Sequence, residues 1–521
     1  MIPLFTTEQI RSADEYAIRD LQIPGIVLME NAAINITETI LDNVEELNSF
    51  DKIGIVAGKG NNGGDGFAVA RHLINSDFHV VVISLAEEKE LKNESLVNFK
   101  ILKNLIKKTG SGKIVQFKKI SDLNLLKECA VLIDAILGTG TKGNIREPYA
   151  SILKKLNGFN SFKVALDIPS GLDADSGFGE IVFEADLTVT LAEMKRGLFV
   201  GHGNLYSGEV IKGGIGIGSE FFDNLQIDDY CIEPEDAYQG LPVRYLNEHK
   251  YSAGKVLTIA GSGKLPGAAF FAANATQKVG CGASILAFPE SLKETAFLKL
   301  DGSTVLTYDD EGRQYLSFKN INELQKKIEW ADVVAIGPGL GREDETREAV
   351  ITILKKNKNI RFVIDADAIF ALKDGKYKNV NLHNSVLTPH MHEFSELIGI
   401  SVEELQKDIF HHGKTFSSST GSTLVLKGAP TIIFTPQGEA LINSTGNPGM
   451  AKFGTGDVLT GAIAGFMSQN KEIEKSVITA VYSHSLAADI LHEEKTVYGF
   501  TATDIMDYLP KAVKLIVSSI L

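Results

Sequence analysis

The chain has 521 residues, of which 44% are hydrophobic and 23% are charged, which is typical of a soluble globular protein with two or more domains. Its net charge of −14 argues against a nucleic-acid-binding or membrane-binding surface. The three cysteines lack C-x-x-C spacing, and neither a secretory signal nor a membrane-spanning stretch is recognisable, so we expect a cytoplasmic enzyme without a disulfide framework or zinc site.

The first predicted strand, at residues 53–57, leads into a glycine-rich loop and then into an apolar helical stretch. Gly58, Gly60 and Gly63 fit the G-x-G-x-x-G spacing, in which glycines let backbone N–H groups approach an anion. Asp65 is unexpected in a plain pyrophosphate cradle, because a carboxylate repels phosphate. The loop therefore predicts a dinucleotide-like ligand with chemistry performed beside it.

Further apolar runs at residues 79–85, 130–137 and 163–168 are separated by helix-length segments. This alternation predicts βαβ units and a parallel sheet with both faces covered. Ligands of such sheets bind outside the carboxyl ends of the strands. Those ends carry three polar, glycine-bearing loops, at residues 61–65, 134–141 and 167–173. We expect the three loops to form one shared site.

A glycine-rich segment at residues 213–218 and an acidic stretch at 226–230 indicate a boundary, so we predict domains of residues 1–225 and 226–521. A second α/β series begins at residues 255–260. Its later strands are predicted at residues 333–336, 361–364, 385–387 and 423–426, and its closing helices at residues 456–467, 471–491 and 501–521.

The sequence Gly454-Thr455-Gly456-Asp457 opens the first of these closing helices. Its glycines leave N–H groups free at the positive end of the helix dipole, which is a binding site for an anion. Asp457 could accept a proton from a hydroxyl that attacks a phosphoryl group. For an isolated motif of this kind, a capping role of the aspartate is an equally good explanation.

Two other loops of the second half carry polar groups. His390 and Glu393 follow a predicted strand, and their spacing is weak for zinc, so a Glu393 that helps to hold Mg²⁺ through water, with His390 touching substrate, is more economical. Lys427 lies in a turn between two β runs and, taken alone, is better explained as a solvated lysine. The glycines of residues 337–341 fit a ligand loop and a tight turn equally well.

The motifs of the two halves resemble two known families. GNNGGDG at residues 60–66, DAILGTG at 134–140 and DIPSGLD at 167–173 resemble NAD(P)H-hydrate epimerase. GPGLG at residues 337–341, TPH at 388–390, KG at 427–428 and GTGD at 454–457 resemble ADP-dependent NAD(P)H-hydrate dehydratase, a ribokinase-like enzyme. The order is that of bifunctional nicotinamide nucleotide repair enzymes. The resemblance implies an N-terminal Rossmann-like parallel-sheet domain followed by a ribokinase-like α/β domain.

For the first half, the resemblance implies epimerisation of the R and S hydrates of NADH and NADPH (NADHX and NADPHX) at C6. Asp167 is the candidate proton shuttle, although capping of the turn at residues 169–171 is an alternative. A K⁺ ion is implied, with oxygen ligands from Asn62, Asp134 and Ser170. Lys195 could also face the site, although a surface position is the simpler explanation. The implied substrate-binding residues are Asn61, Asn62, Gly63, Gly64, Asp65, Gly138, Thr139, Gly140, Thr141, Lys142, Gly143, Asn144 and Asp167.

For the second half, the resemblance implies that the S hydrate is dehydrated at the expense of ADP with Mg²⁺, giving NAD(P)H, AMP and phosphate, with Asp457 as the base. The implied hydrate-binding residues are Ala268, Gly339, His390 and Asp457, and the implied nucleotide-binding residues are Lys427, Gly428, Ala429, Pro430, Thr431 and Gly456. The alternative is a vitamin or sugar kinase with an N-terminal nucleotide-binding module. His390, where many ribokinase-like members carry Asn, favours the dehydratase. We also expect a homo-oligomer.

Overall fold

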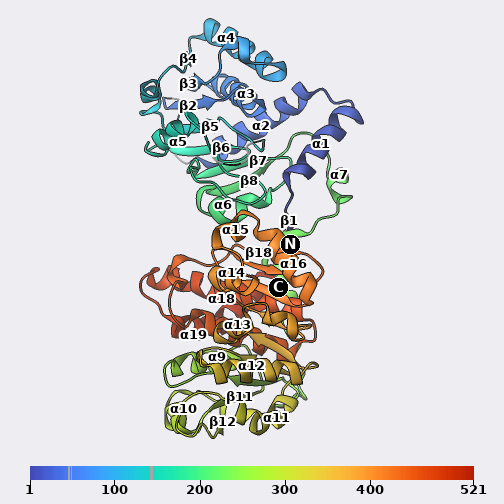
Figure 1. The fold of residues 1–521 in the computed structure, drawn as a ribbon. Helices are drawn as coiled ribbons and strands as arrows, with labels where there is room; N and C mark the ends of the chain where they lie inside the picture. The colour runs from blue at the N-terminus through green and yellow to red at the C-terminus, as the bar shows by residue number, and fades with distance from the viewer. Residues whose placement is uncertain (45–46, 49, 141–142, 144, 521) are drawn as a thin grey trace. The chain divides into compact units, whose positions relative to one another are not determined.

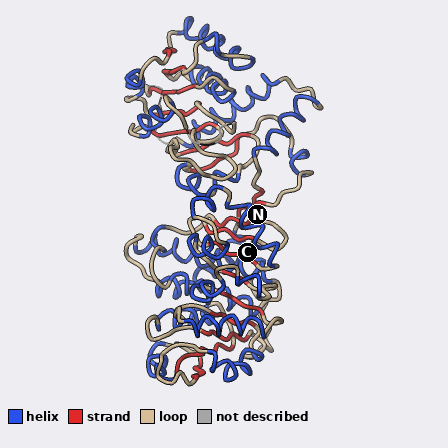
Figure 2. The backbone as a smooth tube through the Cα atoms, in the orientation of Figure 1, coloured by secondary structure: helices blue, strands red, loops and turns tan. Residues whose placement is uncertain are grey.

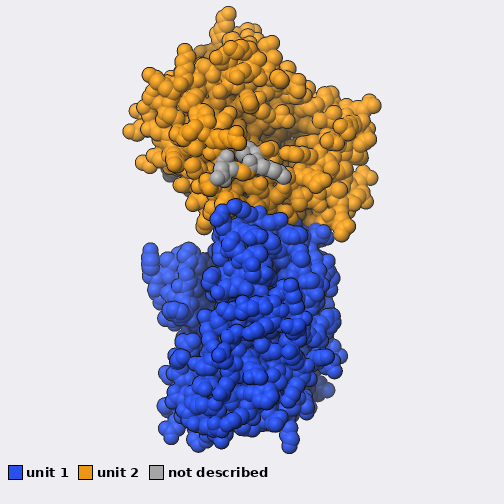
Figure 3. All heavy atoms as spheres, in the orientation of Figure 1, with its two compact units in different colours: residues 1–2, 228–521 blue, residues 3–227 orange. Residues whose placement is uncertain are grey.

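The computed structural model describes residues 1–44, 47, 48, 50–140, 143 and 145–520. These residues form two compact units, one of residues 3–227 and one of residues 1–2 and 228–521, which Figure 3 draws in different colours. Figure 2 shows the strands of each unit lying between helices. None of the helices within these ranges combines the length and the apolar character needed to cross a bilayer.

The unit of residues 3–227 is built on a seven-stranded sheet with the order β4-β3-β2-β5-β6-β7-β8, in which every pairing is parallel (Figure 1). Its strands are β2 (Lys52–Ala57), β3 (His79–Ser84), β4 (Gly112–Gln116), β5 (Val131–Ala135), β6 (Phe162–Leu166), β7 (Leu187–Leu191) and β8 (Glu209–Gly213). The predicted parallel sheet and its four predicted strands are confirmed. Three strands were not predicted: β4, β7 and β8. The side chains of β4 and β8 are largely half-buried or exposed, whereas those of β7 are mostly buried.

Helices cover both faces of this sheet. Ile36, Phe67 and Leu102 belong to the core on one face, and Ile152 and Leu156 to the core on the other. The helices are α1 (Thr7–Arg19), α2 (Gly25–Asn43), α3 (Asn61–Asn75), α4 (Asn93–Thr109), α5 (Tyr149–Asn157), α6 (Gly201–Tyr206) and α7 (Ser219–Asp223). Burial on both faces explains why the central strands are continuously apolar.

The second unit is built on an eleven-stranded sheet with the order β1-β9-β18-β17-β16-β15-β14-β13-β10-β11-β12. The strands from β12 to β16 pair in parallel, and β16, β17 and β18 pair antiparallel. The strands are β1 (Ile2–Pro3), β9 (Asp229–Cys231), β10 (Lys255–Ile259), β11 (Ala283–Pro289), β12 (Thr304–Tyr308), β13 (Val333–Ile336), β14 (Arg361–Ile364), β15 (Val386–Leu387), β16 (Thr423–Leu426), β17 (Thr431–Phe434) and β18 (Ala440–Asn443).

The C-terminal helices contribute the largest share of the core of this unit, with Ile463, Ala480 and Leu509 among its buried members. The predicted closing helices are confirmed as α17 (Thr455–Gln469), α18 (Ile473–Lys495) and α19 (Ala502–Ile520). The other helices are α8 (Pro234–Gln239), α9 (Pro266–Lys278), α10 (Lys293–Lys299), α11 (Ile321–Trp330), α12 (Asp344–Lys356), α13 (Ala366–Leu372), α14 (Met391–Ile398), α15 (Val402–Lys407) and α16 (Ile409–Thr420). Both units are therefore α/β, as predicted.

Candidate active sites

A cavity of about 670 Å³ opens at the carboxyl ends of β2, β5 and β6. Of the predicted epimerase residues, it is lined by Asn61, Asn62, Asp65, Gly138, Thr139, Gly140 and Asp167. Gly63, Gly64 and Gly143 do not line it. Thr141, Lys142 and Asn144 lie outside the described residues. The three predicted loops thus meet at one cavity.

The glycine loop after β2 is shaped by close backbone contacts. A Cβ on Gly58 would lie 2.0 Å from the Ile136 carbonyl oxygen, and a Cβ on Gly63 would lie 2.0 Å from the Gly58 carbonyl oxygen, so only glycine fits at either position. Gly60 is the N-cap of α3 and provides no side chain to cap the helix. The first N–H groups of α3 are therefore available to an anionic ligand.

The predicted cation ligands converge beside this loop. Asn62 donates from Nδ2 to the Leu137 carbonyl oxygen at 2.9 Å, and its Oδ1 is buried without a hydrogen-bond partner in the described part of the chain. Ser170 donates from its hydroxyl to Asp134 Oδ1 and from its backbone N–H to Asp134 Oδ2, both at 2.7 Å. Burial raises the pKa of Asp134 to about 6. The unpaired amide oxygen and its oxygen-rich surroundings fit a hard monovalent cation.

Asp167 forms an ion pair that the sequence did not predict. Its Oδ1 lies 2.7 Å from Lys195 Nζ and accepts a hydrogen bond from the Leu191 N–H at 3.2 Å. Lys195 is fully buried and also donates to Thr190 Oγ1 and to the Leu191 carbonyl oxygen. The surface position predicted for Lys195 is therefore wrong. Asp134, rather than Asp167, accepts the N–H of Ser170 in the turn at residues 169–171.

In the second unit, Lys427 connects three loops. Its Nζ lies 2.8 Å from Asp365 Oδ1, and a Cβ on Gly456 would lie 3.2 Å from the same nitrogen. Its backbone N–H donates to the Pro389 carbonyl oxygen at 2.8 Å, next to His390. The prediction of a solvated lysine is wrong, because the side chain is paired and only 21% exposed. The Lys427 turn, the His390 loop and the start of α17 thus come together.

Asp457 lies in the first turn of α17, as predicted, after Gly454, whose φ of 93° is easily adopted only by glycine. Burial, together with the Asp365 carboxylate, raises the pKa of Asp457 to about 7, although the Lys427 ammonium opposes the shift. A base with a pKa near neutrality suits proton transfer at ordinary pH. Asp365 itself is held by Lys427 and by the Thr460 hydroxyl, which donates to Oδ2 at 2.8 Å.

The predicted hydrate-binding residues Ala268 and Gly339 are neighbours. A Cβ on Gly339 would lie 3.0 Å from Ala268 Cβ, and the Ser262 hydroxyl donates to the Gly339 carbonyl oxygen at 2.8 Å. A Cβ on Gly337 would lie 1.8 Å from the Asp365 carbonyl oxygen. The loop at residues 337–341 is therefore tightly packed against the strand end that carries Asp365.

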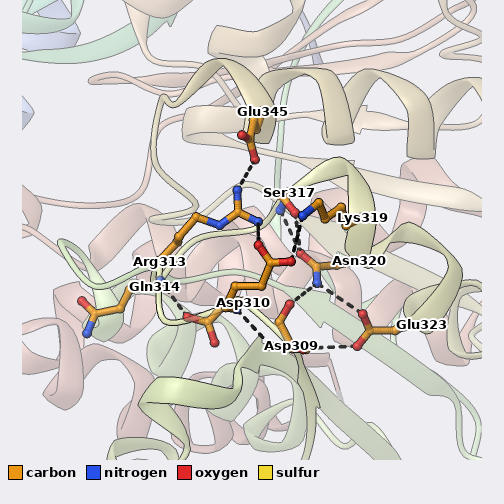
Figure 4. A network of polar contacts seen from close by, with 10 residues as sticks. Asp309, Asp310, Arg313, Gln314, Ser317, Lys319, Asn320, Glu323 and Glu345 are labelled. Carbon is orange, nitrogen blue, oxygen red and sulfur yellow. Dashed lines mark hydrogen bonds and ion pairs between the residues drawn. The ribbon is translucent and has the colours of Figure 1, made fainter.

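Figure 4 shows a polar network that fixes the turn after β12. Asp310 Oδ2 accepts from the Gln314 N–H at 2.7 Å, and Arg313 Nη1 donates to Glu345 Oε2 at 2.7 Å. The Gln314 carbonyl oxygen in turn accepts from the Gly263 N–H at 2.8 Å. The network thereby supports the loop that follows β10 and precedes Ala268.

His390 and Glu393 form a capping box at the start of α14. The His390 N–H donates to Glu393 Oε2 at 2.9 Å, and the Glu393 N–H donates to His390 Nδ1 at 3.2 Å. The carboxylate oxygens of Asp365 and Asp367 all accept hydrogen bonds from the protein. No group of three acidic, His or Cys side chains within the described ranges could enclose a metal. Nucleotide phosphates and water would therefore supply most of the ligands of a Mg²⁺ ion at this site.

The sequence reasoning missed Asp365 and His484. Asp365 directly follows the predicted strand at residues 361–364. Because ligands bind outside the carboxyl ends of parallel strands, this position could have been predicted. His484 lies in the middle of α18, and nothing in the local sequence distinguishes it from an ordinary buried residue. Its Nε2 lies 3.0 Å from the Thr455 carbonyl oxygen, which can only accept, so Nε2 carries the proton. Burial lowers the pKa of His484 to about 4, so the ring is neutral near pH 7.

We predict that His484→Ala lowers the free energy of unfolding by about 1–3 kcal/mol, because the buried Thr455 carbonyl oxygen loses its donor. The turnover of the second site should fall as well, because this contact holds the Gly454–Gly456 backbone in place. His484→Gln, which keeps a side-chain N–H, should recover most of both losses. Denaturant unfolding and steady-state kinetics of the two variants test this, and equal turnover in the alanine variant and the parent would contradict it.

Comparison with known proteins assigns the chain to a family. Residues 25–197 match the family described as "YjeF-related protein N-terminus", and residues 256–511 match the family described as "NAD(P)H-hydrate dehydratase". The bifunctional NAD(P)H-hydrate repair enzyme Nnr of Moorella thermoacetica is 34% identical over 514 residues, which cover 97% of this chain and 96% of that one. The chain belongs to the bifunctional NAD(P)H-hydrate repair enzyme family. The predicted family is thus confirmed, and it replaces the alternative of a vitamin or sugar kinase.

Two solved structures resemble the second half of this repair enzyme. One is a ribokinase-like superfamily protein from Enterococcus faecalis, which is 30% identical, covers 56% of this chain and 98% of its own, and has a TM-score of 0.49. The other is an ADP/ATP-dependent NAD(P)H-hydrate dehydratase from Bacillus subtilis, co-crystallised with ATP and Mg²⁺. It is 29% identical, covers 55% of this chain and 97% of its own, and has a TM-score of 0.48.

Proposed function

We propose that the enzyme repairs NADHX and NADPHX. Residues 1–225 would interconvert the R and S hydrates at C6. Residues 226–521 would dehydrate the S hydrate with ADP, giving NAD(P)H, AMP and phosphate. The main support for this proposal is the carboxyl group of Asp457, which has a pKa of about 7. It lies in the uncapped first turn of α17, close to Lys427, which is paired with Asp365.

Incubation of the protein with ADP, Mg²⁺ and the S hydrate of NADH tests the second activity. We expect dihydronicotinamide absorbance to return as AMP and phosphate form in equal amounts. Absorbance that does not return, with no AMP, would refute the dehydratase. ATP in place of ADP shows which nucleotide is preferred.

The chemistry of the second site follows from the poor leaving ability of hydroxide. Asp457 would take the proton of the C6 hydroxyl. The hydroxyl oxygen would at the same time attack the β-phosphoryl group of ADP, and AMP would leave. The Gly454 and Gly456 N–H groups and Lys427 would stabilise the transferring group. Phosphate then departs with the C6–O electron pair, and loss of a proton from C5 restores the ring double bond. Bound Mg²⁺ would neutralise phosphate charge, with Glu393 as its water-mediated partner.

The proposed ligand contacts of the second unit follow the same arrangement. Ala268, Gly339 and His390 would contact the hydrate. Lys427, Gly428, Ala429, Pro430, Thr431 and Gly456 would contact the adenine nucleotide. The tight packing of Gly339 against Ala268 and the short distance from Lys427 to Gly456 support these roles. The homo-oligomer and the cytoplasmic location remain predictions, and the mass of the protein in solution tests the first.

At the first site, the ring nitrogen beside C6 can stabilise the cation left when water departs, so water can return on either face. Asp167 would move the proton, and Lys195 would hold the Asp167 carboxylate in place. The loops at residues 61–65 and 138–144 would hold the dinucleotide. Asn62, Asp134 and Ser170 would hold K⁺, which when bound would order the loops that carry them.

We predict that K⁺ stabilises the protein against heating and that Asn62→Leu removes this effect, because leucine has a similar size but no oxygen. A ligand at 100 times its dissociation constant stabilises a fold by about 2.7 kcal/mol. Thermal unfolding in KCl and in choline chloride of equal ionic strength measures the effect. An equal rise in the midpoint for the variant and the parent would contradict the site.

A further inference from the structure

Asp65 is one of four carboxyl groups that line the first cavity, together with Asp14, Glu94 and Asp167. It lies in α3, lines the cavity and is only 7% exposed. Within the described residues, its carboxyl group accepts no hydrogen bond and pairs with no cation. Asp167, by contrast, is paired with Lys195. Asp65 on α3 and Asp167 on the loop after β6 therefore reach one cavity in different electrostatic settings.

The surroundings of Asp65 favour its neutral form. Burial raises the pKa of Asp65 well above its usual value, and the carboxylates of Asp167 and Asp14 raise it further. The other charged side chains that line the cavity are Arg11, Lys59 and Glu94. When environments separate the pKa values of two carboxyl groups, one can act as an acid while the other acts as a base.

The second carboxylate oxygen of Asp167, Oδ2, lies on the side of Gly138. Gly138 has no side chain, and a Cβ there would lie 3.7 Å from Asp167 Oδ2 and 3.5 Å from Asn62 Cβ. Lys195 is paired with Oδ1 of Asp167, which leaves Oδ2 on the side of Gly138 to exchange a proton. A ligand at this position would have Asp167 on one side, and the same cavity also carries Asp65.

Epimerisation at C6 requires water to leave one face of the ring and to return on the other. This requires a proton donor on the first face and a proton acceptor on the second. We propose that Asp65 is a second catalytic carboxyl group of the epimerase and acts on the face of C6 opposite to Asp167. The inference rests on the proposed epimerase function. It adds a second catalytic residue and assigns each carboxyl group to one face of C6.

Asp65 gives its proton to the C6 hydroxyl, the C6–O bond breaks with its electron pair on the departing water, and the lone pair of the ring nitrogen forms the C=N bond. A water molecule then adds to C6 from the other face, Asp167 takes its proton, and the C=N electron pair returns to nitrogen. Asp65 ends ionised and Asp167 protonated, which is the form that catalyses the reverse reaction. Exchange of both protons with solvent resets the enzyme.

Asp65→Asn tests the proposal in the full-length protein, with pure R hydrate as substrate in water enriched in oxygen-18. We expect kcat for epimerisation to fall by roughly 10²–10⁴ with little change in KM. Incorporation of oxygen-18 at C6 should fall by the same factor, because it requires the same departure of water. The decline of the parent rate at alkaline pH, where Asp65 would lose its proton, should disappear.

Asp77→Asn is the matched control, since it makes the same charge change at an exposed position just after α3 and should epimerise as the parent does. The same preparations are also assayed for ADP-dependent dehydration of the S hydrate, and a parent-like rate shows that each variant is folded. Parent-like kcat in Asp65→Asn, or a loss confined to KM, would overturn the proposal. A parent that does not epimerise at all would instead refute the proposed function of the first unit.

Discussion

Replacing Asp457 by asparagine should lower kcat for ADP-dependent dehydration by roughly 10²–10⁴, the contribution typical of a general base. Asparagine has nearly the same shape as aspartate, so the loss would come from the missing base. The KM values for ADP and hydrate should change little. AMP release measured against time, with and without hydrate, gives these constants. Epimerisation by the same variant should equal that of the parent, and dehydration at the parent rate would contradict the role of Asp457.

The same base predicts how dehydration depends on pH. Asp457 must be ionised to accept a proton, and burial together with Asp365 raises its pKa to about 7. The rate should therefore be low in acid and rise as the pH increases through about 7. Lys427 lowers the pKa of Asp457, so Lys427→Met should move this rise to higher pH as well as slow the reaction. A flat profile between pH 5 and pH 9 in the parent would contradict this assignment.

The predicted site residues that the structure brings together lie in local motifs. Gly58 and Gly63 are needed for contacts within one strand–loop–helix unit, so their spacing is visible in the sequence. Asp457 is placed by the start of its own helix. Such features depend on a few consecutive residues and on the rule that the carboxyl ends of parallel strands meet at one edge.

The contacts that were not predicted join distant parts of the chain. Lys195 is buried because the strand end at Thr190 and Leu191 and the carboxylate of Asp167 surround its charge. A sequence suggests a surface position for any lysine. His484 is recognisable only once α18 packs beside the start of α17. Partners of this kind are set by tertiary packing, and no local pattern encodes them.

The buried pair of Asp167 and Lys195 predicts a change that affects both stability and activity. Asp167 has a φ of 68°, which asparagine also tolerates, so Asp167→Asn removes the charge without straining the backbone. Lys195, fully buried, would then lack its counter-charge. Breaking a buried pair in this way costs about 3–5 kcal/mol. Epimerisation should be lost together with this stability, and denaturant unfolding alongside an assay with R hydrate measures both.

The double variant Asp167→Asn with Lys195→Met separates the two effects. Methionine fills the space of the lysine stem without its charge, so the stability lost in Asp167→Asn should largely return. Epimerisation should not return, because the carboxylate that moves the proton is still absent. Lys195→Met alone should keep part of the activity, since Asp167 is 15% exposed to the cavity and can be solvated there. A double variant that regains epimerisation would show that the pair serves the fold alone, and the proton would then have to move through another group of the cavity.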